Sequence, residues 1–280
     1  MNKIALVFDF DDTLAPDSTS SFLESMGLDV HHFWQERVQP LLEKGWDPIP
    51  AYLYMMIEES NARTSEKITR EALINYGEKI ALHNGVNTIF TRLKDHAKKQ
   101  YPEIELEFYL ISSGIGDIVR NTKISKNFKE IWACDFEYTE AGAIKFPKRI
   151  VSFTDKTRYL FHISKGIVGK AFESKPFEVN KKVESAKLRI PMDQLIFVGD
   201  GYTDVPCFSL VMKSGGIAFG VYDMNHREKW GRAWGFIEDR RVSNLLSANF
   251  APKSDLSNSL IMAIDSIAQR TQLKMRTYQG

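Results

Sequence analysis

The chain has 280 residues, of which 43% are hydrophobic and 26% are charged, as is ordinary for a globular protein. Its formal net charge of +1 gives no overall field that would attract nucleic acid or an anionic membrane. The amino-terminal residues lack the apolar stretch of a signal peptide, and no run approaches the roughly 18 apolar residues of a membrane span. Two cysteines, Cys134 and Cys207, do not make a disulfide framework. We therefore expect a cytoplasmic protein.

The first expected strand is the apolar run at residues 4–8, which ends at the acidic sequence DFDDT. A continuous apolar run is typical of a strand buried on both faces, as in a parallel sheet. Residues from about 17 to 84 differ, because their apolar residues recur at helical spacing and no strand is predicted. Pro40 is expected to kink or end the helix predicted over residues 30–42.

From about residue 85 the pattern alternates between helices and strands. We predict helices from about residues 86, 155 and 257, a further helix after residue 201, a hairpin over 137–146, and strands at 107–112, 130–136, 195–198 and 216–220. Such alternation predicts an α/β fold, with a Rossmann-like parallel sheet and helices on both faces.

The helical block is interpreted as an insertion at the carboxyl edge of the first strand. Ligands bind at that edge in open α/β sheets, so an insertion there can cover the site as a cap. We assign residues 1–16 and 85–280 to the core, and residues 17–84 to a helical cap.

Two carboxylates separated by one residue follow the first strand. Asp9 and Asp11 would repel each other beside buried surface, and a bound cation would offset that cost. Oxygen ligands of this kind suit Mg²⁺, which commonly takes substrate phosphate as a further ligand. A polar turn after a strand explains this segment alone equally well.

A second acidic segment, GDGYTD at residues 199–204, also follows an apolar strand and precedes a helix. Asp200 can supply a third carboxylate to the cation, and Asp204 can hold a metal-bound water or orient the other ligands. A helix N-cap accounts for one of these acids. It does not account for acids at the ends of two separate apolar strands.

A phosphate-binding turn and a lysine complete the set. Ser112, Ser113 and Gly114 can hold a phosphate oxygen through Oγ and backbone N–H groups, although Ser-Gly turns are common without a function. Several carboxylates and a phosphate carry more negative charge than one Mg²⁺ neutralises, so a positioned lysine is expected. Lys156, at the start of a predicted helix, is our first choice, and Lys165 is the second.

The order of these segments resembles that of the haloacid dehalogenase-like (HAD) superfamily of phosphohydrolases. The order is Asp-x-Asp-x-Thr, Ser, Lys and Gly-Asp-Gly-x-Thr-Asp. The resemblance covers about residues 1–16 and 85–220. The Ile-Ser-Ser-Gly segment and the helical block resemble its phosphoserine-phosphatase-like branch, which has a helical cap. Among its motifs, the first and last are specific, whereas the serine and lysine motifs are not.

The resemblance implies a magnesium-dependent phosphatase that hydrolyses a phosphate monoester of a small metabolite through an aspartyl-phosphate. Asp9 would be the nucleophile, and Asp11 would protonate the leaving alcohol and then activate water. The resemblance also implies a metal site and a substrate site: Asp9, Asp11, Asp200 and Asp204 at Mg²⁺, and Thr13, Ser112, Ser113, Gly114 and Lys156 at the phosphate.

The chain departs from this pattern in two places. Phosphoserine phosphatase carries a substrate-binding glutamate soon after the first motif, whereas Asp17 is the only acid in the corresponding stretch here. Phosphoserine is therefore a doubtful substrate. Lys156 also lies further before Asp200 than is usual, and an insertion near residues 166–183 would explain this spacing.

Other functions stay open. A phosphotransferase could use the same aspartyl-phosphate, and a HAD-like module could serve only for binding, although every expected catalytic residue type is present. A 2-haloacid dehalogenase would not need an acid at position 11, and the helical block does not suit a receiver-like domain.

We expect a phosphorylated small molecule as partner, and neither nucleic acid nor a membrane. Packing is the expected role of four aromatic residues in the predicted cap: Trp34, Trp46, Tyr52 and Tyr54.

Overall fold

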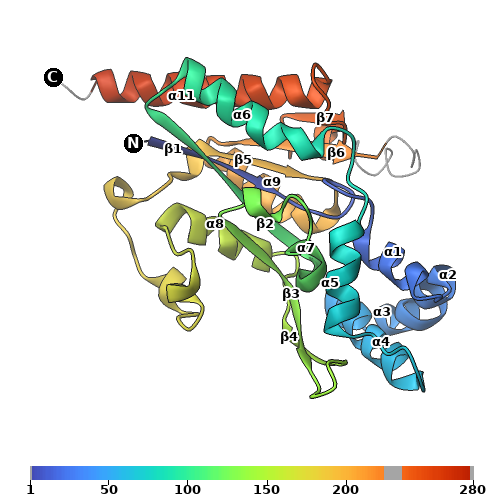
Figure 1. Ribbon diagram of the computed structural model, residues 1–280. Helices are drawn as coiled ribbons and strands as arrows, with labels where there is room; N and C mark the ends of the chain where they lie inside the picture. Colours follow the sequence, from blue (N-terminus) through green and yellow to red (C-terminus); the bar gives the residue numbers. More distant parts are fainter. Residues whose placement is uncertain (1, 224–234, 278–280) are drawn as a thin grey trace.

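The computed structural model describes residues 2–223 and 235–277 (Figure 1). Within them, seven strands form one sheet in the order β4-β3-β2-β1-β5-β6-β7. Neighbouring strands pair in parallel, except that β3 and β4 are antiparallel. The strands are β1 (Asn2–Phe8), β2 (Ile104–Ile115), β3 (Glu130–Tyr138), β4 (Ile144–Arg149), β5 (Leu195–Gly199), β6 (Ile217–Tyr222) and β7 (Asn244–Ser247). The predicted α/β fold is confirmed.

Helices cover both faces of this sheet (Figure 1). α6 (Val86–Gln100) and α11 (Asp255–Thr277) lie on one face, and α8 (Asp155–Lys165) and α9 (Val205–Lys213) lie on the other. Alternate residues of β1 enter two separate hydrophobic clusters: Ile4, Leu6 and Phe8 enter the cluster under α6 and α11, and Ala5 and Val7 enter the other. Because both faces of β1 are buried, every one of these positions is apolar.

Residues 17–84, which we call the helical insert, follow β1 and gather at one end of the molecule (Figure 1). The insert contains α1 (Ser18–Ser25), α2 (Val30–His32), the π-helix η1 (Phe33–Val38), α3 (Gln39–Glu43), α4 (Pro48–Ala62) and α5 (Arg70–Lys79). Asp17 caps α1 by accepting hydrogen bonds from the N–H groups of Thr19 and Ser20.

The disturbance predicted at Pro40 takes the form of a π-helix just before it. The N–H of Gln39 donates to the carbonyl of Trp34, five residues back, as in a π turn. Pro40 has no N–H with which to continue regular α-helical bonding at this point. The π turn is therefore explained by Pro40, where the sequence predicted only that the helix would kink or end.

The hairpin of β3 and β4, predicted at residues 137–146, contacts the helical insert. The N–H of Arg70 donates to the carbonyl of Gly142 at 2.9 Å, and the N–H of Ile144 donates to the carbonyl of Ile68 at 3.0 Å. Main-chain hydrogen bonds thus tie the insert to the sheet at a point distant from β1.

Between α8 and β5 the chain contains only short 3₁₀ turns, where the sequence suggested an insertion near residues 166–183. These turns are η3 (Lys170–Phe172), η4 (Glu178–Asn180), η5 (Ser185–Lys187) and η6 (Met192–Gln194). Arg189, near the end of this segment, donates to Glu107 of β2 at 2.6 Å and to the hydroxyl of Tyr109 at 2.8 Å. The extra length therefore loops out from the sheet and is anchored back to it.

Three smaller findings complete the fold. β7 was not predicted, because it has four residues and only Leu246 is buried. Cys134 and Cys207 are both buried and unbonded to each other. In the described part of the chain, no helix combines the length and the apolar character that crossing a membrane requires.

Arg189 yields a prediction about stability. Burial alone would raise the pKa of Glu107, but hydrogen bonds from Arg189, Tyr109 and Lys3 lower it to about 2. Arg189→Ala leaves this buried carboxylate with fewer donors, so we expect the free energy of unfolding to fall by about 1–3 kcal/mol. Urea denaturation measures the change. Lys187→Ala, at an exposed ion pair in the same segment, should change it by less than about 0.5 kcal/mol.

Candidate active site

The site forms where three parallel strands end side by side. β1 lies between β2 and β5, and Phe8 at its end is aligned with Leu110 of β2 and Val198 of β5. The residues just beyond these positions therefore share one edge of the sheet. This edge brings together the two acidic segments and the serine turn that are far apart in the sequence.

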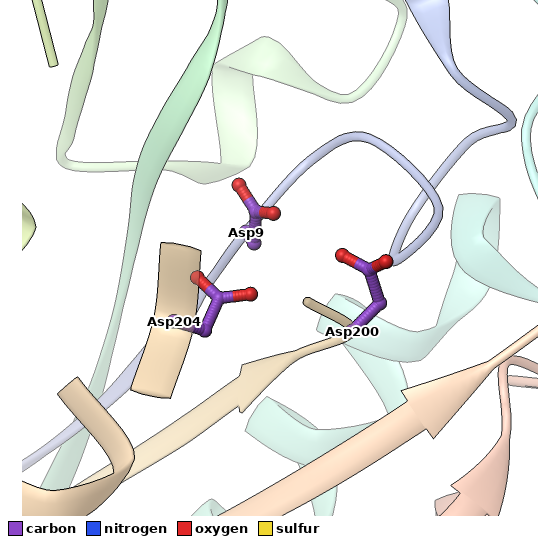
Figure 2. A group of neighbouring side chains, drawn as sticks. All are labelled: Asp9, Asp200 and Asp204. Atoms are coloured by element: carbon purple, nitrogen blue, oxygen red, sulfur yellow. The ribbon is translucent and has the colours of Figure 1, made fainter. Parts of the chain in front are cut away.

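Three aspartates converge at this edge (Figure 2). Asp9, Asp200 and Asp204 each offer a carboxylate oxygen, and these oxygens lie within 4.8 Å of one another. Asp9 is 5% exposed and Asp204 is fully buried. Several carboxylate oxygens at this spacing are the ligands that a hard divalent cation prefers.

Burial, together with the proximity of the other acids, raises the pKa values of Asp9 and Asp200. Burial raises the pKa of Asp9 to about 8, the charge of Asp204 adds to this effect, and Lys156 opposes it. Burial and the charge of Asp9 also raise the pKa of Asp200 well above its usual range. A bound cation would favour the ionised form of these carboxylates and offset the repulsion between them. This donor set therefore fits a metal ion.

Lys156 lies directly beside two of these acids. Its fully buried Nζ is 2.7 Å from Asp204 Oδ1 and 3.1 Å from Asp9 Oδ1, and it donates to Thr203 Oγ1 at 3.1 Å. Burial alone would lower the pKa of Lys156, but the charges of Asp204 and Asp9 raise it above the usual value. The lysine is therefore a permanent positive charge within the cluster.

Lys165 lies elsewhere, near the end of α8. Its Nζ donates to the carbonyls of Val179 and Lys181 at 2.6 Å and 2.7 Å. Of the two lysines that the sequence suggested, the structure therefore brings only Lys156 to the carboxylates. The other one holds the segment between α8 and β5.

Asp11 faces the serine turn from the loop after β1. Its Oδ1 accepts a hydrogen bond from the N–H of Ser18 at 2.8 Å. Burial raises the pKa of Asp11 to about 7, with a further contribution from the charge of Asp17. A Cβ atom on Gly114 would lie 2.3 Å from Asp11 Oδ2, so only glycine allows this approach.

The two serines of the turn have different surroundings. Ser112 is fully buried, and its Oγ accepts a hydrogen bond from the N–H of Gly114 at 2.9 Å. Ser113 and Gly114 line the open cavity, and within the described residues Ser113 Oγ makes no hydrogen bond. Thr13 is buried beneath the loop and does not line the cavity. Ser113 therefore lines the cavity, although its Oγ atom is itself buried, and Ser112 lies below it.

A cavity of about 540 Å³ opens over these groups. Its floor contains Asp9, Asp11 and Asp200, and its opposite wall comes from the helical insert. Trp34 and Tyr52, which the sequence led us to assign to packing, line this wall as well as packing against each other at a ring distance of 5.9 Å. Further lining residues that sequence reasoning did not select are Phe153, Tyr202, Thr203 and Phe236.

The other two aromatic residues of the insert behave as predicted. Trp46 and Tyr54 contact each other at a ring distance of 5.2 Å, are partly exposed and do not line the cavity. All four aromatic residues belong to the same helical block. No local signal in the sequence separates the pair at the cavity from the pair on the surface.

No protein-family model matches this chain. An uncharacterized protein from Borreliella burgdorferi is 27% identical to it, and the alignment covers 94% of this chain and 97% of that protein.

Solved structures show more about the fold. A probable phosphoserine phosphatase from Vibrio cholerae aligns with a TM-score of 0.57 at 11% identity, over 96% of this chain and 67% of that one. A phosphoserine phosphatase with a phospho-aspartyl intermediate analogue aligns at 0.54 and 14% identity, over 93% and 98%. A HAD-family hydrolase from Salmonella enterica serovar Typhi aligns at 0.55 and 14% identity, over 80% of this chain and 64% of its own length. The chain therefore has the fold of HAD-family hydrolases, phosphoserine phosphatases among them.

The acidic cluster predicts how stability depends on pH. The pKa of Asp9 rises from 3.8 to about 8 on folding, so between these pH values the metal-free folded protein binds more protons than the unfolded chain. Its free energy of unfolding should therefore fall as the pH rises through this window, by up to about 1.4 kcal/mol per pH unit for each such group. Mg²⁺ should raise the Tm more at pH 8 than at pH 5.

Differential scanning calorimetry with and without Mg²⁺ measures both effects. The matched variant is Asp200→Asn, which removes one acid and one ligand. It should show a flatter pH dependence and a smaller Mg²⁺ response. An equal response in the variant and the parent would contradict metal binding at this cluster.

Proposed function

We propose that the chain is a magnesium-dependent phosphatase that hydrolyses a phosphate monoester through an aspartyl-phosphate on Asp9. The observation that carries the proposal is the cluster of buried carboxylates around a buried lysine, on the floor of a cavity. A binding module of this fold would have no need to keep so many like charges out of water.

In the first step, Asp9 attacks the phosphorus atom and the bond to the ester oxygen breaks. Lys156, 3.1 Å from Asp9 Oδ1, favours the ionised form of the nucleophile and aligns it, and a bound cation would favour that form further. Asp11, whose pKa is raised to about 7, can carry a proton near neutral pH and give it to the departing alcohol oxygen.

In the second step, the ionised Asp11 takes a proton from water as the water oxygen attacks the phosphorus. The bond between phosphorus and Asp9 breaks, and inorganic phosphate and the free carboxylate are released. Asp11 faces both Gly114 and the cavity, so one carboxyl group can serve both steps.

The other site residues hold the reacting groups. We propose that Ser112, Ser113 and the backbone at Gly114 bind the phosphate, and that Thr13 supports the loop of Asp9 and Asp11. Mg²⁺, held by Asp9, Asp200 and the backbone carbonyl of Asp11, would neutralise charge on the phosphate. Asp204 accepts from the N–H of Gly201 at 3.2 Å and holds Lys156, which suits an orienting role.

We further propose that residues 17–84 act as a cap domain over a core of residues 1–16 and 85–280. The insert supplies the wall of the cavity that faces the strand ends, and main-chain hydrogen bonds to the β3–β4 hairpin hold it there. A cavity of this size, with the insert as one wall, favours a phosphorylated small molecule.

Substitution of the nucleophile tests the mechanism. Asp9→Asn should lower kcat/KM for p-nitrophenyl phosphate by at least about 10³-fold, because an amide cannot form the acyl phosphate. EDTA should abolish turnover by the parent. Asp12→Asn, at the neighbouring acid that fits no catalytic role, should retain activity within about tenfold. Turnover that survives Asp9→Asn or ignores EDTA would sink the proposal.

The contact between Gly114 and Asp11 gives a second test. Gly114→Ala places a Cβ 2.3 Å from Asp11 Oδ2 and must displace this carboxyl group. We expect kcat to fall by about 10²–10⁴-fold, the usual range for lost acid–base catalysis, with an unchanged circular dichroism spectrum. Gly235→Ala is the matched control, because no atom of the residues that the structure describes lies within 4 Å of the added atom. Full activity of Gly114→Ala would contradict the role of Asp11.

A further inference from the structure

The wall of the cavity that the helical insert supplies indicates what kind of alcohol the phosphate is attached to. This inference rests on the proposed phosphatase function. The wall is largely apolar, and its apolar side chains are those of Trp34, Val38, Leu42, Pro48, Ile49 and Tyr52. Two amides, Gln35 and Gln39, lie among them.

The π-helix η1 (Phe33–Val38) contributes three residues to this wall. Trp34, Gln35 and Val38 belong to it, and Gln39, whose N–H donates to the carbonyl of Trp34, follows directly. A π turn widens the helix and changes which side chains share a face, and such turns are frequent at functional sites. The backbone conformation of η1 therefore helps to decide which side chains form the wall.

The polar atoms of the two aromatic residues are already bonded within the protein. Trp34 Nε1 donates to Ser20 Oγ at 2.9 Å, and the hydroxyl of Tyr52 donates to the carbonyl of Ser113 at 2.5 Å. What remains for a ligand is the apolar surface of the two rings. The second of these bonds also fixes the Tyr52 ring relative to the serine turn that faces Asp11.

The charges around the cavity disfavour a second anion on the substrate. Every residue of the insert is described, and among them no lysine, arginine or histidine lines the cavity. The insert contributes one acid, Asp17, whose carboxylate accepts from the N–H groups of Thr19 and Ser20 and from Ser20 Oγ. The floor adds the carboxylates of Asp9, Asp11, Asp12 and Asp200. A carboxylate on the alcohol would meet like charges and no cation of the insert.

We propose that the substrate is a phosphate monoester whose leaving alcohol is uncharged or cationic and lays an apolar surface against the insert. Esters whose alcohol carries a carboxylate or a second phosphate, such as phosphoserine or a phosphoglycerate, are poor substrates. A cavity of about 540 Å³ is large enough for such an alcohol together with the phosphate.

A panel of four esters tests this substrate class. We would compare kcat/KM at pH 7 with Mg²⁺ for benzyl phosphate (neutral), phosphocholine (cationic), phosphoserine and 3-phosphoglycerate. Either or both of the first two should exceed both carboxylate esters by at least about tenfold, because an unpaired charge in a site is strongly rejected. A carboxylate ester that matches or exceeds them would overturn the inference.

Binding separates this inference from the proposed function. The four esters are titrated calorimetrically into the Mg²⁺-loaded Asp9→Asn variant, and the same order of affinity is expected. The expected order without any turnover by the parent would contradict the phosphatase and leave the substrate class supported. A reversed order, or no binding of any ester, would overturn the substrate class.

One substitution should relax the selectivity. Gln35→Lys introduces a cation into the wall, so the ratio of kcat/KM for 3-phosphoglycerate to that for benzyl phosphate should rise at least about tenfold. Asn61→Lys is the matched control, since it adds the same charge at an exposed position of the insert that does not line the cavity. An equal change in both variants would show a general effect of charge and would contradict the role of the wall.

Discussion

The structure depends on one electrostatic arrangement, in which buried carboxylates lie next to each other around a buried ammonium group. Asp9 and Asp204 would repel each other strongly out of water, and Lys156 contacts both of them at 3.1 Å and 2.7 Å. One lysine does not neutralise all the acids of the cluster, and burial together with this excess negative charge raises the pKa values of Asp9 and Asp200. The arrangement is costly in a protein that binds nothing and suits one that binds a cation and a phosphate.

The order of the strands makes this arrangement possible. Because β1 is central and pairs with β2 and β5, three strand ends deliver their polar residues to one place. The apolar strands hold those ends rigidly, since both of their faces are buried. The loop after β1 then brings Asp11 against Gly114, where the lack of a side chain decides how closely the two loops can approach.

The departures from the phosphoserine-phosphatase pattern have structural explanations. Asp17, the only acid near the position of a substrate-binding glutamate, caps α1 and is occupied by hydrogen bonds of that helix. The long spacing between Lys156 and Asp200 corresponds to the segment of 3₁₀ turns that Arg189 anchors on Glu107. The first departure places an aspartate that caps α1 in the cavity wall. The second departure does not move Lys156 away from Asp9 and Asp204.

The sequence by itself determined the fold class and the two acidic segments. Strands that are buried on both faces must be apolar along their whole length, and closely spaced acids after such strands need a local explanation. It ranked Lys156 above Lys165 without deciding between them, because the reach of a side chain depends on where its helix lies against the sheet. It also could not show that Ser113 lines the cavity while Ser112 lies below, or that Trp34 and Tyr52 line it while Trp46 and Tyr54 do not. Those distinctions depend on which face of an element meets another element, and only the tertiary structure decides this.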